Sequence, residues 1–119
     1  MPMLALAAPP PIVAPAPPAR MLVFADEFRY GASRRVVPAG RPLLLQLKNI
    51  GEDDHDLRIV GPRGGVRART GIVAPGGLGR IRVRLPRGRF TYFCTVADHA
   101  ALGMRGSLLV KRPARRGRR

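Results

Sequence analysis

Several residue types that mark common protein classes are scarce in this chain of 119 residues. A single cysteine excludes an internal disulfide, and two histidines exclude any site that needs three or more imidazoles. Tryptophan is absent and aromatic residues make up 5% of the chain, which leaves few rings for stacking on nucleic-acid bases. No apolar run reaches the roughly 18 residues that a membrane-spanning helix requires. The length fits one compact domain and is too short for two.

Acidic residues are scarce as well. Seven Asp and Glu stand against 22 Lys and Arg, so the formal net charge is +15. This charge suggests nucleic-acid binding as an alternative function. Such binding requires a concentrated basic surface, usually with aromatic rings. Six of the cations cluster at residues 111–119 and the others are dispersed. Nucleic acid is therefore disfavoured as the main partner.

Composition divides the chain into three parts. Residues 1–20 hold seven of the 13 prolines, mixed with alanine, and are predicted to be a disordered linker. They lack the charged start and long apolar stretch of a whole signal peptide, yet Ala5-Leu6-Ala7 has the form of a cleavage site. Two interpretations stay open: a low-complexity tail, or the remnant of a truncated signal, which would place the protein in the periplasm or at the cell surface. Residues 112–119 are predicted to be a disordered basic tail.

The central part, residues 21–111, is predicted to fold as one all-β domain. Leu43, Leu45 and Leu47 alternate with Leu44, Gln46 and Lys48, which is the period of a strand with one buried face. Fourteen glycines and 13 prolines punctuate the chain, and no segment indicates a helix. We expect an antiparallel Greek-key β-sandwich of seven or eight strands. The expected strands are 21–24 with 28–30 as one broken strand, 35–37, 43–47, 57–60, 81–85, 90–95 and 107–111.

One set of residues carries distinctive chemistry. Cys94, His99 and Met104 follow one another with the spacing C-x4-H-x4-M, and His55 lies about forty residues upstream. A thiolate, two imidazoles and a weak thioether form the ligand set of a blue-copper electron-transfer site. The sulfur ligands favour Cu(I) and the imidazoles also suit Cu(II), so such a site changes oxidation state with little rearrangement. The sequence therefore predicts a copper site with these four residues as ligands.

These motifs resemble a known family. Residues 90–110, F-T-Y-F-C-T-V-A-D-H-A-A-L-G-M-R-G-S-L-L-V, resemble the ligand loop and last strand of the cupredoxins, the plastocyanin/azurin-like blue copper proteins. Its spacing is similar to that of the rusticyanin-like or azurin-like members. The run N-x-G-x-x-x-H-D-L, which begins at Asn49, resembles the segment that supplies their first histidine. The resemblance implies a monomeric single-electron carrier with one type 1 copper, a redox protein as partner and no enzymatic activity.

The resemblance also implies roles around the metal. Many cupredoxins carry Asn after the first histidine, where it connects the two ligand segments, and this chain has Asp56. We expect Asp56 to accept hydrogen bonds from Thr95, with Asn49 also supporting the site. Asp98 stands where many members have Pro or Gly. Carboxylates so near the metal favour Cu(II) and lower the reduction potential.

The loop around His99 is expected to dock the redox partner. In cupredoxins the second histidine presents its ring edge at the surface within a rim of small or apolar residues, and this loop is similar. The net positive charge predicts docking to an acidic partner surface or to an anionic surface of the cell envelope. The predicted rim consists of Val96, Ala97, Ala100, Ala101 and Leu102.

Other interpretations of the same residues remain open. A copper-delivery protein would use the same ligands without a dedicated redox partner. Zinc binds Cys and His, but two histidines and one cysteine fall short of the usual four ligands of a structural zinc site. A lone cysteine or methionine is often only a core residue. The acidic run 52–54 favours a solvated turn over a hard-cation site, because no further carboxylates lie at a complementary spacing.

Overall fold

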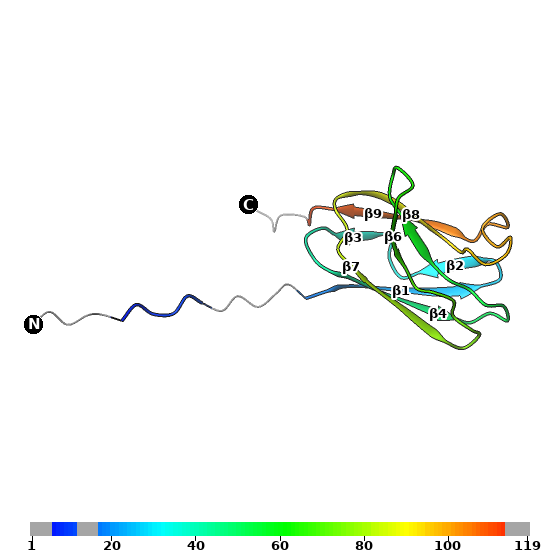
Figure 1. Cartoon of the computed structure of the whole chain (residues 1–119), viewed down its shortest axis with the longest axis horizontal. Coiled ribbons are helices and arrows are strands. Elements are labelled where there is room, and N and C mark those ends of the chain that lie inside the picture. The colour runs from blue at the N-terminus through cyan, green and yellow to red at the C-terminus, as the bar shows by residue number, and fades with distance from the viewer. Residues whose placement is uncertain (1–5, 12–16, 114–119) are drawn as a thin grey trace, which may run out of the picture.

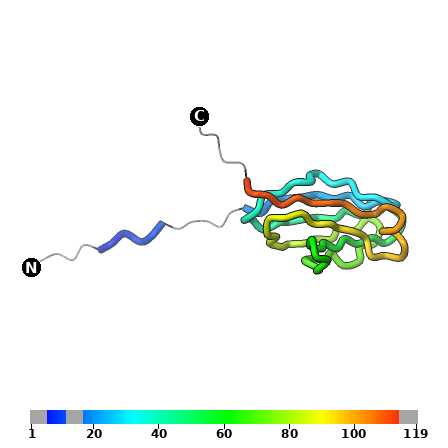
Figure 2. The backbone as a smooth tube through the Cα atoms, turned by 90° about the horizontal axis from the view of Figure 1, so that it is seen from above, coloured from blue at the N-terminus to red at the C-terminus, as the bar shows by residue number. Residues whose placement is uncertain are grey.

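The structure, a computed structural model, describes residues 6–11 and 17–113. The linker prediction for 1–5 and 12–16, and the tail prediction for 114–119, lie outside the described residues. Nine strands form two sheets that pack face to face (Figures 1 and 2). No helix long and apolar enough to cross a membrane occurs within the described ranges. The predicted all-β sandwich is confirmed.

The first sheet has four strands in the order β2-β1-β4-β7. Strands β1 and β4 run parallel, and the other neighbouring pairs are antiparallel. Leu45 and Leu47 on β4 are fully buried, while Gln46 between them is only half-buried, as the alternation predicts. The bounds are β1 Ala19–Asp26, β2 Arg29–Ala32, β4 Leu43–Asn49 and β7 Leu78–Val83.

The second sheet has five strands in the order β3-β9-β8-β5-β6, with β3 and β9 parallel. Phe90, Leu108 and Ile59 point inward from it and complete the core with the leucines of β4. Burying this apolar surface is the main stabilising contribution to the sandwich. The bounds are β3 Val36–Pro38, β5 Arg58–Val60, β6 Val66–Arg69, β8 Gly88–Phe93 and β9 Arg105–Lys111.

The structure corrects three details of the strand prediction. The sheets are mixed rather than wholly antiparallel, and there are nine strands among the described residues. The segments 21–24 and 28–30 belong to two strands that form a hairpin with its turn at Glu27 and Phe28. Strand β6 was not predicted, because its sequence Val-Arg-Ala-Arg is mostly exposed and has only two apolar residues, which is a short alternation.

The folded part begins slightly earlier than predicted. Strand β1 starts at Ala19, which is 5% exposed and pairs with Leu43, two residues before the expected boundary at Met21. The N-terminal segment leaves the sandwich at one end, and the loop that follows β8 lies at the opposite end (Figure 1). The β1–β2 turn is at that far end too. It is there that the predicted ligands meet.

Candidate metal centre

His55, Cys94 and His99 form one buried cluster, although they come from two segments of the chain. Cys94 directly follows β8, and its backbone N–H donates to the carbonyl of Met104 at 3.1 Å. His55 lies in the loop between β4 and β5, where its backbone pairs with Val73 through two hydrogen bonds of 3.1 and 2.7 Å. These backbone contacts set the positions from which the three side chains converge.

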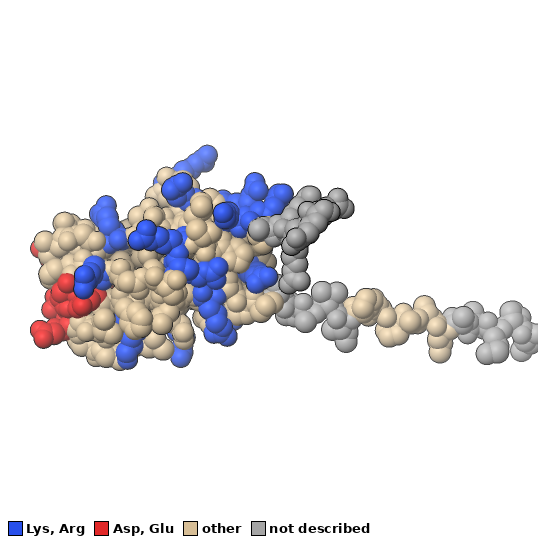
Figure 3. Space-filling model, turned by 180° about the vertical axis from the view of Figure 1, so that it is seen from behind, with Lys and Arg blue, Asp and Glu red and all other residues tan. Residues whose placement is uncertain are grey.

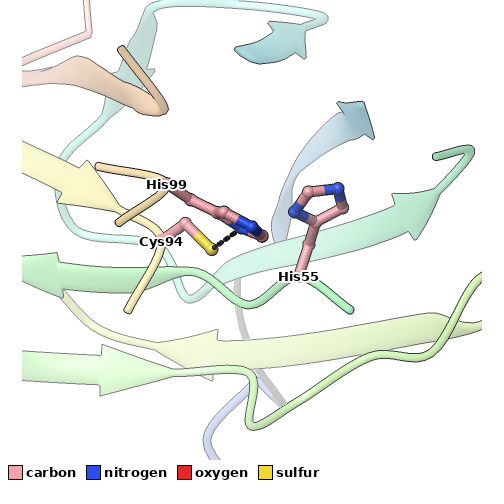
Figure 4. A group of neighbouring side chains, drawn as sticks. All are labelled: His55, Cys94 and His99. Atoms are coloured by element: carbon pink, nitrogen blue, oxygen red, sulfur yellow. Dashed lines mark hydrogen bonds between the residues drawn. The ribbon is translucent and has the colours of Figure 1, made fainter. Parts of the chain in front are cut away.

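The side chains are close enough to share one metal ion. Their ligand atoms lie within 4.8 Å of one another, and Cys94 Sγ is 3.5 Å from His99 Nδ1 (Figure 4). A metal binds imidazole nitrogen and thiolate sulfur at about 2.0–2.3 Å, so ligands of one ion lie roughly 4 Å apart. The exposed fractions are 0% for His55, 1% for Cys94 and 4% for His99. The cluster therefore matches a closed metal centre in size and chemistry.

His55 gives a second reason to place a metal here. Both of its ring nitrogens are buried and have no hydrogen-bond partner in the part of the chain that the structure describes. A buried polar atom without a partner costs about 1–3 kcal/mol. One ring nitrogen faces Cys94 and His99, and the other points away from them (Figure 4). The nitrogen that faces the cluster is the one next to the ring carbon that carries the side chain, which is Nδ1 (Figure 4), and the other, Nε2, lies beside Glu27.

Met104, the predicted fourth ligand, is fully buried at the end of the same loop. Its backbone N–H donates to the carbonyl of His99 at 3.0 Å, and its own carbonyl accepts from Cys94. The loop 94–104 is thus closed on itself, with three of the four predicted ligands on it. Binding of the metal by the Met104 sulfur remains a prediction.

The contact predicted between Asp56 and Thr95 is present. The Thr95 backbone N–H donates to Asp56 Oδ1 at 2.5 Å, and the Thr95 hydroxyl donates to Oδ2. Asp56 is 5% exposed, and its backbone carbonyl also accepts a hydrogen bond from the Tyr30 hydroxyl. The side chain of Asp56, which follows His55, thus binds Thr95, which follows Cys94. This contact holds the two segments together.

Asn49 supports the other side of the His55 loop. Its side-chain amide donates to the carbonyls of Asp53 and Val73, each at 2.8 Å, and its oxygen accepts from the Gly51 N–H at 2.9 Å. Because Val73 in turn pairs with the backbone of His55, the buried Asn49 holds this backbone partner together with Asp53, two residues before His55. A role of Asn49 in metal binding remains a prediction.

Burial raises the pKa of the Cys94 thiol, and hydrogen bonds from the backbone of Asp56 and Val96 act in the opposite direction. The thiolate is the form that binds metal. Metal binding must therefore release a proton from Cys94, which makes the apparent affinity fall as pH falls.

The turn between β1 and β2 contributes residues that sequence reasoning missed. Glu27 Oε1 lies 3.4 Å from His55 Nε2, and the Phe28 ring is 4.8 Å from the His99 ring between centroids. Glu27 also accepts backbone hydrogen bonds from Asp53 at 2.6 Å and Glu52 at 2.7 Å. The Asp53 hydrogen bond is the main reason that the pKa of Glu27 falls to about 2. No local pattern in the sequence signals the contact between Glu27 and His55, because these residues are 28 positions apart.

His99 is less exposed than expected. Phe28 packs against its ring, and Asp53 Oδ2 lies 3.3 Å from its Nε2, so the ring edge is covered. The predicted rim is partly open: Leu102 is 53% exposed, Ala97 and Ala101 are exposed, and Val96 and Ala100 are half-buried. Asp98 is exposed beside them.

Comparison with solved structures places this fold among the cupredoxins. An auracyanin from the photosynthetic bacterium Roseiflexus castenholzii has a TM-score of 0.67 and 24% identity, over 80% of this chain and 98% of that chain. Auracyanin A, a "blue" copper protein from Chloroflexus aurantiacus, has a TM-score of 0.66 and 18% identity, over 79% and 99%. Rusticyanin from Thiobacillus ferrooxidans has a TM-score of 0.61 and 20% identity, over 77% of each chain. No family model and no curated protein matches the sequence.

The fold is therefore that of the cupredoxins, as the motifs predicted. At these identities the similarity establishes the shared fold, and the case for a metal rests on the residues of this chain.

Proposed function

We propose that this protein is a type 1 copper protein that carries single electrons between redox partners. The convergence of His55, Cys94 and His99 in one buried cluster carries this proposal. The cupredoxin fold supports it, since auracyanin A is described as a blue copper protein. Bound copper would supply the one-electron couple between Cu(I) and Cu(II).

The ligand set suits copper better than other metals. The Cys94 thiolate and the Met104 thioether are soft ligands that favour Cu(I), and the imidazoles of His55 and His99 suit both oxidation states. We propose Met104 as the weak axial ligand, because it is buried on the same loop and its backbone bonds to the other two ligands there. The hydrogen bonds of Asp56 hold the ligand segments in place through both oxidation states.

Electron transfer fits this centre better than catalysis. A catalytic metal keeps an open coordination position for substrate, whereas none of the three clustered ligands is more than 4% exposed. An electron carrier needs a rigid centre close to the surface and no space for a substrate. We therefore assign the protein no enzymatic activity of its own. As separate proposals, the protein acts as a monomer, and it acts outside the cytoplasm.

The partner is proposed to dock over the rim around Leu102. The chain's net charge predicted an acidic partner, but the charge near the centre has the opposite sign. All seven acidic residues lie at 26–27, 52–54, 56 and 98, in the segments around the centre, and acidic side chains gather at the end away from the termini in Figure 3. We therefore propose a partner that is basic where it meets this rim, because opposite charges speed association.

Copper binding and redox cycling test this function together. Purified protein is titrated with Cu(II), reduced with ascorbate and reoxidised with ferricyanide. We expect one copper per chain and an intense visible band that disappears on reduction and returns on reoxidation. Tight binding without reversible cycling would contradict an electron carrier and favour copper delivery.

A further inference from the structure

Glu27 contacts both the His55 ring and the loop that leads to it. We infer that Glu27 is a positioning residue of the metal centre, which orients the His55 imidazole so that Nδ1 faces Cys94 and His99. This inference rests on the proposed function for its effect on copper, but the orientation itself is a property of the protein alone.

The first observation is the set of groups around the Glu27 carboxylate. Its Oε1 accepts the backbone N–H groups of Glu52 and Asp53 and lies 3.4 Å from His55 Nε2. The side chain is 25% exposed, whereas that of His55 is fully buried. The carboxylate therefore reaches from the surface to the inner side of the loop and stands beside the imidazole edge that points away from the cluster.

The second argument concerns which nitrogen of the His55 ring carries the hydrogen. A neutral imidazole has one N–H. Glu27 Oε1 lies 3.4 Å from Nε2 without the geometry of a hydrogen bond, and its negative charge favours the form that carries the hydrogen on Nε2. In that form the lone pair is on Nδ1, which is the nitrogen that faces Cys94 and His99 (Figure 4). Histidines that bind metals usually donate their other N–H to a carboxylate, carbonyl or water, which fixes the ring and makes it a stronger ligand.

The same carboxylate also acts on the second histidine. Glu27 accepts a hydrogen bond of 2.6 Å from the backbone N–H of Asp53, and the Asp53 side chain lies 3.3 Å from His99 Nε2. His99 Nδ1 is the nitrogen that faces Cys94. Each histidine thus has a carboxylate at Nε2 and its Nδ1 toward the cluster, and Glu27 is connected to both.

Gly51 provides a way to move this carboxylate without removing its charge. A Cβ added to Gly51 would collide with the carboxylate atoms of Glu27. The end of a flexible side chain can shift more easily than backbone, so Gly51→Ala should displace Glu27 from His55. Glu52→Gln is the matched control, because it removes an exposed charge from the same loop without a histidine contact.

The first experiment needs no copper. Nitrogen-15 NMR of the metal-free full chain at neutral pH reports which ring nitrogen of each histidine carries the hydrogen. We expect His55 to be protonated on Nε2 in the unmodified protein and in Glu52→Gln. We expect a mixture of the two tautomers in Glu27→Ala and in Gly51→Ala. An unchanged tautomer in both variants would overturn the inference.

The second experiment measures copper directly. Loss of a carboxylate next to a ligand should weaken Cu(II) binding by about tenfold. If Cu(I) binding is unchanged, this raises the one-electron reduction potential by about 59 mV. We expect this shift in Glu27→Gln and not in Glu52→Gln.

Equal shifts in the two variants would show a general charge effect and would overturn the inference. Failure of the unmodified protein to bind copper would instead refute the proposed function and leave the NMR result standing.

Discussion

The Asp56 carboxylate accepts two hydrogen bonds from Thr95, one from the backbone N–H and one from the hydroxyl. Asp56 follows His55 and Thr95 follows Cys94, so this pair connects two ligand-bearing segments 39 residues apart. The carboxylate is almost buried, with Asp56 at 5% exposure, whereas Thr95 is exposed. Support of this kind keeps the ligands of a metal centre in a fixed arrangement.

Removal of the Asp56 carboxylate should loosen the centre. We predict that Asp56→Ala weakens copper binding by about tenfold, as the loss of other outer-shell partners does. Asp56→Asn keeps an acceptor for the Thr95 N–H and should retain most of the affinity. Competition titration with a copper chelator measures both. Asp54→Ala, which removes an exposed carboxylate two residues away, is the control, and an affinity equal to that of Asp56→Ala would count against this role.

Met104 should determine the reduction potential more than the colour. Met104→Gln places a harder ligand next to copper and favours Cu(II), so the potential should fall while the visible band persists. Spectroelectrochemistry measures both quantities on one sample. Met21 is another buried methionine, in β1, and Met21→Gln should leave the potential unchanged in whatever fraction folds. A Met104→Gln potential equal to that of the unmodified protein would exclude Met104 as a ligand.

Leu102 should matter for the rate of electron exchange and not for the centre itself. It is 53% exposed on the rim beside His99, and a charge there prevents a partner from excluding water. We predict that Leu102→Asp slows self-exchange, measured by NMR line broadening in mixtures of oxidised and reduced protein, with an unchanged visible spectrum. Val66→Asp adds the same charge at an exposed site on β6. Equal rates in the two variants would place electron exit elsewhere.

The start of β1 should matter for stability. Ala19 is buried, and its N–H donates to the carbonyl of Pro42 at 2.8 Å. A chain that begins at residue 17 should keep the melting temperature of the full chain within a few degrees. A chain that begins at Met21 loses the first pairs between β1 and β4 and should melt lower. Calorimetry compares the three, and identical melting temperatures would contradict a structural role for Ala19.

Sequence alone predicted the features that are encoded locally. The alternation of Leu43, Leu45 and Leu47 identified a strand with one buried face, and the spacing of Cys94, His99 and Met104 predicted a ligand loop, of which Cys94 and His99 lie in the cluster with His55. The Asp56 contact was also predictable, because both partners immediately follow ligands.

Features that depend on the packing of distant segments were not predictable in this way. Strand β6 is mostly exposed, and its four residues include only two apolar ones, so its alternation is short. The burial of His99 depends on Phe28 and Asp53, which arrive from two other loops. Glu27 reaches His55 only because the turn after β1 folds over the loop after β4. Net charge has a related limit, since it does not report where the few acidic residues gather, and the charge of the partner stays a prediction.

The visible spectrum with Cu(II) tests the central claim most directly, when the unmodified protein is compared with Cys94→Ser. The colour of a blue copper site arises from the thiolate–copper bond, and Cys94 is the only cysteine in the chain. We predict an intense band for the unmodified protein and none for Cys94→Ser, with melting temperatures measured in parallel to show that both chains are folded. A band that persists in folded Cys94→Ser, or its absence from the unmodified protein loaded with copper, would contradict the proposed centre.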